Sequence, residues 1–268
     1  MVKLSVNVNK IATVRNSRGG RLPSVVDAVR VCIDAGAPGV TVHPRADARH
    51  ITRDDVFDVA AELAPLRGRI EFNIEGDPRP DLIELVLEVR PDQCTLVPVM
   101  PGEITSQAGW TMEAPGEGLA AAIRTLQAAG VRVSLFVDPD PAAVQWVASL
   151  GADRIELYTE PFARAFERGP DDAQASFAGY VKAAHHAHGL GLGINAGHDL
   201  DLRNLTLFRE LPYLDEVSIG HALVSRALFV GLGPVVREYL AVLQMSDGRL
   251  GGYVPDVTHQ TPGPKGNR

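Results

Sequence analysis

Short apolar, β-branched runs alternate along the chain with longer stretches in which apolar residues recur at three- and four-residue spacing. The short runs predict strands at 4–9, 39–44, 69–75, 93–98, 132–138, 154–159, 190–195 and 216–221. The longer stretches predict helices at 23–35, 54–65, 80–89, 117–129, 141–150, 172–188, 202–210 and 222–243. Strand and helix therefore alternate from one end of this region to the other.

Eight successive strand–helix pairs are typical of an α/β protein with a closed (β/α)8 TIM barrel. The alternative, a doubly wound open sheet, more often has about five to seven strands and a glycine-rich first turn. We expect residues 1–245 to form one barrel domain. Residues 246–268 are rich in glycine and proline and lack a period, so they predict a flexible tail.

Two insertions interrupt the alternation, at 99–118 after the fourth predicted strand and at 160–176 after the sixth. Both follow the carboxyl end of a strand. Because the loops at these ends build the functional site of a TIM barrel, we expect each insertion to act as a lid or a subunit contact.

Charge and composition narrow the function classes. The net charge of −7 argues against nucleic-acid binding, yet residues 1–53 hold nine Lys/Arg against three Asp/Glu. This local excess favours a small anionic ligand over a polyanion, the alternative being ordinary solvated charge. The chain lacks both a long apolar run and a signal-peptide pattern, so we expect a cytoplasmic protein without membrane contact. The two cysteines, Cys32 and Cys94, lie in apolar segments and are expected in the core.

Polar and ionisable residues follow the predicted strands at the ends where a TIM barrel carries its site. The first strand offers Asn7 and Asn9, which share a face if the strand continues that far, followed by Lys10. The later strands contribute the residues His43, Arg45 and His50; Glu71, Asn73 and Glu75; Asp138; Glu156; Asn195, His198 and Asp199; and Ser218, Gly220 and His221. One such histidine alone favours a structural role, but histidines and glutamates at several strand ends together predict acid–base chemistry.

Gly220 stands at the turn from the last predicted strand into a helix. Backbone N–H groups and the helix dipole at such a turn can bind an anion, and this place is the usual phosphate pocket of the fold. The alternative is a glycine kept for steric reasons. By contrast, His185, His186 and His188 lie together in the last turn of a predicted helix, where they suit the helix dipole, and we assign them no metal.

Six stretches of the chain resemble the pyridoxine 5′-phosphate synthase family, which acts in the deoxyxylulose-phosphate-dependent route to vitamin B6. They are "IATVRNSRGG" (11–20), "GVTVHPRADARHI" (39–51), "CTLVP" with "EITS" (94–98 and 103–106), "VSLFVD" (133–138), "NAGH" (195–198) and "IGHALVSRAL" (219–228). The resemblance covers residues 4 to about 243 in the expected order.

The resemblance implies a transferase that condenses 1-deoxy-D-xylulose 5-phosphate with 3-amino-2-oxopropyl phosphate, giving pyridoxine 5′-phosphate, phosphate and water. It implies no cofactor and no metal, and it implies a homo-oligomer, an octamer. It makes His43 a proton acceptor, Glu71 a second acid–base residue and His198 a proton donor. It assigns the deoxyxylulose phosphate to Arg45, His50 and Thr105, and the amino-oxopropyl phosphate to Asn7, Arg18, Gly220 and His221. Asn9, Lys10, Glu156 and Asp199 are expected to line the same site, whereas Arg15 is interpreted as structural.

Two positions depart from the family pattern, and at a third the pattern does not decide between two residues. Asn9-Lys10 stands where better-known members have an Asp-His pair, so an amide and an ammonium replace an acid and an imidazole. Asp199 stands where glycine is usual. Glu75 is a rival to Glu71, because the sequence around both matches the family less closely and both lie on one strand face. We expect the activity to be retained, with Lys10 contributing a fixed positive charge.

Two other functions remain open from the sequence. A metal-dependent barrel hydrolase could use the same histidines as ligands, but such sites usually place His-x-His on the first strand and Asp on the eighth, and here these positions read "NVN" and "SIGH". A non-catalytic or substrate-shifted phosphosugar-binding barrel is the second alternative, suggested by Asn9-Lys10. It predicts binding without turnover.

Overall fold

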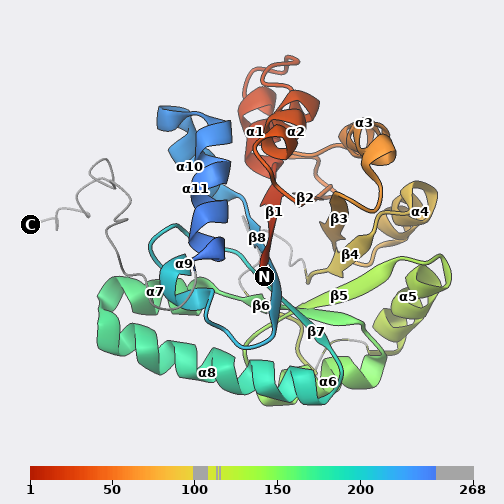
Figure 1. Cartoon of the computed structure of the whole chain (residues 1–268). Coiled ribbons are helices and arrows are strands. Elements are labelled where there is room, and N and C mark those ends of the chain that lie inside the picture. The colour runs from red at the N-terminus through yellow and green to blue at the C-terminus, as the bar shows by residue number, and fades with distance from the viewer. Residues whose placement is uncertain (99–107, 113, 115, 246–268) are drawn as a thin grey trace, which may run out of the picture.

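Eight parallel strands close into a barrel in which each strand pairs with the next and β8 pairs with β1. The computed structural model describes residues 1–98, 108–112, 114 and 116–245. The strands are β1 (Lys3–Asn7), β2 (Gly39–Val42), β3 (Glu71–Gly76), β4 (Gln93–Leu96), β5 (Arg132–Val137), β6 (Arg154–Tyr158), β7 (Gly193–Gly197) and β8 (Leu214–Ile219). All eight predicted strands are present, and the predicted (β/α)8 barrel is confirmed (Figure 1).

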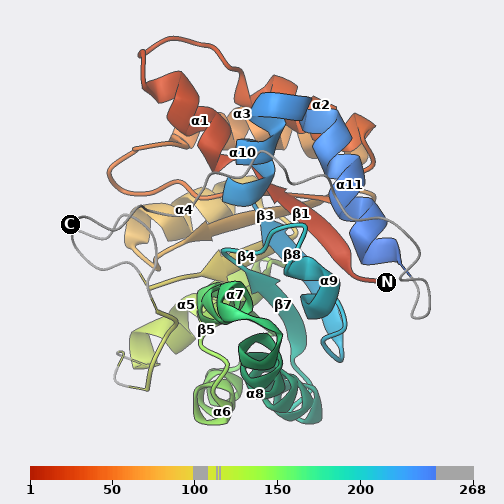
Figure 2. The same ribbon diagram turned by 90° about the vertical axis from the view of Figure 1, so that its left-hand side faces the viewer.

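Helices surround the barrel on its outside (Figures 1 and 2). They are α1 (Asn9–Asn16), α2 (Val25–Asp34), α3 (Arg53–Leu63), α4 (Pro80–Val89), α5 (Gly116–Ala128), α6 (Pro141–Leu150), α7 (Glu160–Arg168), α8 (Pro170–Gly189), α9 (Leu205–Phe208), α10 (His221–Val230) and α11 (Leu232–Gln244), with a short 3-10 turn at Ala64–Leu66. No helix in the described part of the chain is both long enough and apolar enough to span a bilayer.

The observed elements depart from the predicted ones in three places. β1 ends at Asn7 and α1 begins at Asn9, so the prediction that Asn7 and Asn9 share a strand face is wrong. The insertion after β6 forms α7 and the start of α8. The predicted helix at 222–243 is two helices, because Gly231 has φ +91° and ends α10 before α11 begins.

Local sequence signals set several helix ends. The Asp140 side chain accepts a hydrogen bond from the Ala142 N–H, with Pro141 as the first helical residue, and Gly151 closes the same helix with φ +85°. Thr52 and Asp55 form a reciprocal capping box at the start of α3. These caps fix where the loops at the two ends of the barrel begin.

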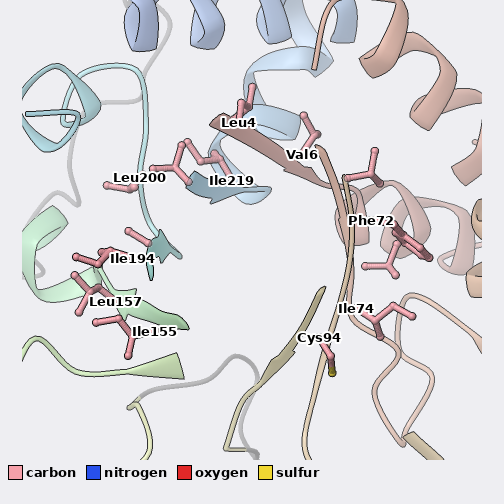
Figure 3. Close-up of a cluster of buried hydrophobic side chains, with 14 of the residues drawn as sticks. Leu4, Val6, Phe72, Ile74, Cys94, Ile155, Leu157, Ile194, Leu200 and Ile219 are labelled. Carbon is pink, nitrogen blue, oxygen red and sulfur yellow. The ribbon is translucent and has the colours of Figure 1, made fainter. Parts of the chain in front are cut away.

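The core lies between the strands and the helices. Outward-facing strand residues such as Leu4, Ile74, Ile155 and Ile219 are fully or almost fully buried, and Figure 3 shows them pointing away from the middle of the ring. Cys32 and Cys94 are both free and buried, as predicted.

The inside of the barrel is polar. Side chains alternate along a strand, so the positions between the apolar ones face inward. Ser5 Oγ and Thr41 Oγ1 lie 2.7 Å apart, and Asn73 links Thr41 at 3.4 Å to Thr95 at 3.2 Å. The interior therefore carries a hydrogen-bonded network instead of the branched apolar side chains that are common in this fold.

Predicted features outside the described residues include Thr105, most of the insertion at 99–118 and the segment 246–268. The division of the chain into a barrel and a flexible tail therefore stays a prediction.

Candidate active site

Most of the predicted site residues meet at the carboxyl end of the barrel. Asn7, His43, Glu75, Glu156, His198 and Gly220 lie on or directly after β1, β2, β3, β6, β7 and β8. Because these strands are parallel and neighbouring, their ends surround one opening. In Figure 2, β1 runs from the N-terminal label toward α1 and α10, which lie beside this opening.

His43 follows β2 and is buried, with 8% of its surface exposed. Asn9 Oδ1 accepts a hydrogen bond of 2.9 Å from the His43 N–H, so the first turn of α1 fixes the backbone of this histidine. Burial lowers the pKa of His43 to about 3, with a further lowering from His50, Arg45 and Arg79. The imidazole is therefore neutral. Its Nε2 is buried and has no hydrogen-bond partner among the described residues, as expected of an atom that a substrate would engage.

His50 lies near His43, with ring centroids 5.9 Å apart. Its Nδ1 accepts a hydrogen bond of 3.0 Å from the Ile51 N–H, so the proton of the neutral ring is on Nε2. Burial lowers the pKa of His50 to about 4, and Lys10 is the largest charged contributor to that shift. Lys10 therefore lies within electrostatic range of His50, as expected if both serve one anion.

Arg15 and Asn16 of α1 hold the loop that carries His50. Arg15 donates to both carboxylate oxygens of Asp55, one of them at 2.8 Å, and to the His50 carbonyl oxygen at 3.2 Å. Asn16 Nδ2 donates to the same carbonyl at 2.8 Å. The structural interpretation of Arg15 thus agrees with its contacts, because Arg15 supports the site without belonging to it.

Glu75 lies at the carboxyl end of β3 and is 8% exposed. The Asn7 amide donates to one of its carboxylate oxygens and the Ser218 hydroxyl to the other, each at 3.3 Å. Burial raises the pKa of Glu75 to about 7, the Ser218 hydrogen bond opposes this rise and the charge of Glu216 adds to it. A carboxyl group that titrates near neutral pH suits general acid–base catalysis.

Glu71 lies at the other end of the same strand. It is the first residue of β3, and its carboxylate forms ion pairs with Lys3 and Arg132, which begin β1 and β5. Glu71 therefore belongs to the amino end of the barrel, and its predicted place in the site is wrong. The period of two puts Glu71 and Glu75 on one face, but four residues of extended chain separate them by roughly 13 Å along the strand.

Glu156 of β6 is a second buried carboxyl group at the opening, 4% exposed. Burial raises its pKa well above 4.5, and the neighbouring Glu75 raises it further. Its Oε1 fills the space where a side chain on Gly197 would begin, and its Oε2 is buried without a hydrogen-bond partner in the described structure. A charged Glu75 therefore favours the protonated form of Glu156.

His198 and Asp199 follow β7. His198 Nδ1 and Asp199 Oδ2 are 2.7 Å apart, and the His198 ring packs edge-on against Tyr158 at 5.2 Å. The hydrogen bond from His198 is the largest cause of the lowered pKa of Asp199, so this carboxylate is charged at neutral pH. The sequence singled out both residues but did not predict their contact.

Gly220 caps the amino end of α10, and His221 is the first residue of that helix. A Cβ atom on residue 220 would lie 2.9 Å from the Asn7 carbonyl oxygen and 3.1 Å from Asn7 Oδ1, so the close approach of β1 and β8 requires glycine here. His221 is exposed at the helix start, and Arg18 is exposed in the turn after α1. Neither side chain lies in the buried part of the site.

Two further residues contact the site, although neither was assigned a role from the sequence. Arg79 donates to the Pro44 carbonyl oxygen at 2.6 Å and its charge acts on His43. Ser218 supports Glu75. Ser218 stood at a predicted strand end, but Arg79 lies before α4, where nothing in the local pattern distinguishes it from surface arginines. Among the described residues, no three His, Cys, Asp or Glu side chains gather as a metal ion would require.

Comparison with known families gives one match over most of the chain. Residues 4–245 match the family described as pyridoxal phosphate biosynthesis protein PdxJ. A pyridoxine 5′-phosphate synthase from Bacteroides fragilis is 52% identical over 240 residues, covering 89% of this chain and 98% of that protein. The enzyme of the same name from Leptospira biflexa is 48% identical over 257 residues, covering 92% and 99%.

Solved structures of other barrels share the fold at low identity. A 3-hexulose-6-phosphate synthase from Salmonella typhimurium aligns with a TM-score of 0.61 at 14% identity, covering 90% of this chain and 98% of that one. Thiamine phosphate pyrophosphorylase from Pyrococcus furiosus aligns with a TM-score of 0.58 at 14% identity, covering 90% and 95%. These alignments support the fold, while the matches at about half identity decide the relationship: the chain belongs to the PdxJ family of pyridoxal phosphate biosynthesis proteins.

Proposed function

We propose that the protein is a pyridoxine 5′-phosphate synthase that condenses 1-deoxy-D-xylulose 5-phosphate with 3-amino-2-oxopropyl phosphate to pyridoxine 5′-phosphate, phosphate and water. The names of its relatives support the product. The single observation in this chain that carries the chemistry is the buried opening in which a neutral His43, with an unpartnered Nε2, lies in the same barrel mouth as the carboxyl groups of Glu75 and Glu156.

The proposed roles of the acid–base residues follow from their protonation states. Condensing an amine with a ketone, losing water and phosphate, and closing a ring each move protons, so groups with different pKa values are needed. His43 is neutral and can accept a proton, whereas Glu75 has a pKa raised to about 7 and can serve as acid or base. Glu75 takes the acid–base role that the sequence had given to Glu71. His198 is the proposed proton donor.

Substrate binding is proposed for the cationic side of the opening. Lys10, Arg45 and His50 bring two fixed charges and one N–H donor to the ends of β1 and β2, and this set would hold the deoxyxylulose phosphate together with Thr105. Asn7, Gly220, His221 and Arg18 would hold the amino-oxopropyl phosphate at the start of α10.

The test is product formation by chelator-treated protein given both phosphorylated substrates. We expect pyridoxine 5′-phosphate from the wild type, a loss of at least about 100-fold in kcat for His43→Ala and Glu75→Gln, and little change for the matched control Glu71→Gln. A rate that needs added metal would support the hydrolase alternative. Binding of both substrates without product would support the non-catalytic or substrate-shifted barrel and overturn the proposal.

A homo-oligomer, an octamer, is part of the same proposal. Leu228, Phe229 and Val230 end α10 with 70%, 78% and 43% of their surface exposed, and Leu22 near α1 is 78% exposed. Contiguous exposed apolar residues of this kind are typical of protein interfaces. Light scattering should give a mass several times that of one chain, and Phe229→Asp should lower it.

A further inference from the structure

The residues directly after β7 form a fixed turn around one contact. His198 has φ +84°, a left-handed conformation that costs a residue other than glycine roughly 1 kcal/mol. This conformation lets the side chains of two adjacent residues meet, with His198 Nδ1 and Asp199 Oδ2 2.7 Å apart. Strain of this kind persists only where the surroundings hold it in place.

Asn204 supplies that support. Its side chain is buried, with 4% of the residue exposed, and donates to the Asp199 carbonyl oxygen at 3.0 Å while accepting from the Asp201 N–H at 2.9 Å. The Asp201 carboxylate accepts from the backbone N–H of Asn204 at 2.8 Å, so the two residues close the turn reciprocally. The His198–Asp199 contact is therefore not a chance meeting of mobile surface side chains.

The His198 ring is held on a second side by β6. The Tyr158 ring meets it edge-on, with centroids 5.2 Å apart and an interplanar angle of 79°. With one contact through Nδ1 and one through the ring, the remaining freedom of the imidazole is small. The ring nitrogen that these contacts leave available is Nε2.

We propose that Asp199 is a positioning residue that fixes the tautomer of His198, holding the proton on Nδ1 so that Nε2 is the atom that delivers a proton to the substrate. This inference rests on the proposed function and deepens it. An ionised carboxylate can only accept a hydrogen bond, so the shared proton must be carried by Nδ1. The lowered pKa of Asp199 keeps the carboxylate ionised at neutral pH.

The proton balance of the step is simple. In the imidazolium form both ring nitrogens carry hydrogen, and the Asp199 carboxylate stabilises that positive charge. Transfer breaks the Nε2–H bond and forms an O–H bond on the leaving oxygen of the substrate. The ring returns to the neutral Nδ1–H tautomer without losing its bond to Asp199, so no reorientation is needed before the next turnover.

Other charged groups face the pair from the surrounding elements. Glu160 and Arg164 of α7 form an ion pair with each other, so their charges largely offset. His221 of α10 acts on Asp199, and Asp138, after β5, acts on the neighbouring Tyr158. Of these groups only Asp199 is hydrogen-bonded to the His198 ring. Asp199 also lines an open cleft of about 720 Å³ with Glu160 and Arg164, which gives solvent access to its carboxylate.

The experiment compares wild type with Asp199→Asn, which keeps the size of the side chain and removes its charge. We expect kcat to fall about tenfold and KM for both substrates to change less than about twofold. The ¹⁵N shifts of the His198 ring should change from the Nδ1–H tautomer to a mixture. Asp199→Glu should restore part of the rate, and Asp171→Asn, an exposed residue of α8, is the control for loss of one charge.

The outcomes separate the two proposals. An active wild type with an unchanged tautomer in Asp199→Asn, or with unchanged kcat in that variant, would overturn the positioning role. A wild type that makes no pyridoxine 5′-phosphate would overturn the proposed function instead, and the tautomer measurement would still decide whether Asp199 fixes the ring.

Discussion

The carboxyl group of Glu156 occupies the space that Gly197 leaves by having no side chain. The two residues lie on the neighbouring strands β6 and β7, where Gly197 is the register partner of Tyr158, two residues beyond Glu156. A Cβ atom on residue 197 would collide with Glu156 Oε1 and lie 3.3 Å from the Ser218 carbonyl oxygen. Because Glu156 is 4% exposed, its carboxyl group has little room to withdraw. The glycine of β7 thus determines where a carboxyl group of β6 stands.

We therefore expect Gly197→Ala to lower kcat by at least about tenfold and the free energy of unfolding by about 2 kcal/mol, since overpacking a buried site is costly. Enzyme assays and urea unfolding measure the two effects. Gly179→Ala is the matched control, because a Cβ atom there meets nothing within 4 Å and the residue lies inside α8. The free energy of unfolding of that variant should rise by about 0.5–1 kcal/mol. Equal activity of Gly197→Ala and wild type would contradict the packing argument.

Glu71→Gln should affect stability more than catalysis. The Glu71 carboxylate pairs with Arg132, whose side chain is 30% exposed, and with the more exposed Lys3, so its loss should cost about 1 kcal/mol. The rate should stay within about twofold of wild type, because the carboxylate lies at the amino end of β3. Steady-state kinetics together with thermal unfolding test this, and a loss of rate comparable to that of Glu75→Gln would refute the separation of the two glutamates.

His43 should make the protein sensitive to acid. Its folded-state pKa of about 3 lies below the ordinary value of 6.5, so below pH 6.5 the unfolded chain takes up a proton that the folded chain refuses. The free energy of unfolding should therefore fall as the pH falls, by about 2 kcal/mol between about pH 7.5 and about pH 5. Urea unfolding of wild type and His43→Gln at both pH values measures it. The variant should lose about 2 kcal/mol less over this interval, and identical losses would show that His43 is not the source.

The Arg15–Asp55 pair should control the loop that carries His50. Both side chains are nearly buried, at 13% and 10% exposure, so Arg15→Gln leaves a carboxylate without its partner and should cost about 3 kcal/mol. We also expect KM for the deoxyxylulose phosphate to rise at least about fivefold and the Ile51 amide to exchange faster with solvent.

The matched control for this pair is Arg30→Gln. Arg30 pairs with Asp27 and Glu62 on the surface, with 54% of its side chain exposed, so the change should leave the free energy of unfolding nearly unchanged. The double variant Arg15→Gln with Asp55→Asn should be less destabilised than the sum of the single variants. Additive effects would mean that the two residues act separately.

The fold was predictable because each strand–helix unit carries its own signal. The apolar run of β5, for example, is followed by a break, and Asp140-Pro141 and Gly151 bracket α6 with local chemistry that needs no tertiary context. The start of α1 was not predictable in this way. Asn7 and Asn9 fit an alternating strand pattern, but the Asn7 side chain accepts from the Asn9 N–H at 3.1 Å and turns the chain into a helix two residues early.

The sequence predicted which strands carry the candidate site, but not how far along each strand its residues lie. The sequence rule that polar residues at strand ends are functional assumes an apolar interior, and here Thr41 and Asn73 are polar inside the barrel as well. Period alone therefore could not separate Glu71 from Glu75. The contacts of Arg79 and of the His198–Asp199 pair depend on how loops approach one another, which no local pattern encodes.

The polar interior of the barrel also affects which substitutions this chain can accept during evolution. Most of the apolar contact that stabilises the fold lies in the layer between strands and helices, where Ile74, Ile155 and Ile219 are buried. Inward-facing positions add little to that layer. An exchange such as threonine for serine among them therefore alters the lining of the barrel interior with little change in the free energy of unfolding. Selection can thus adjust the chemistry of this enzyme nearly independently of its folding.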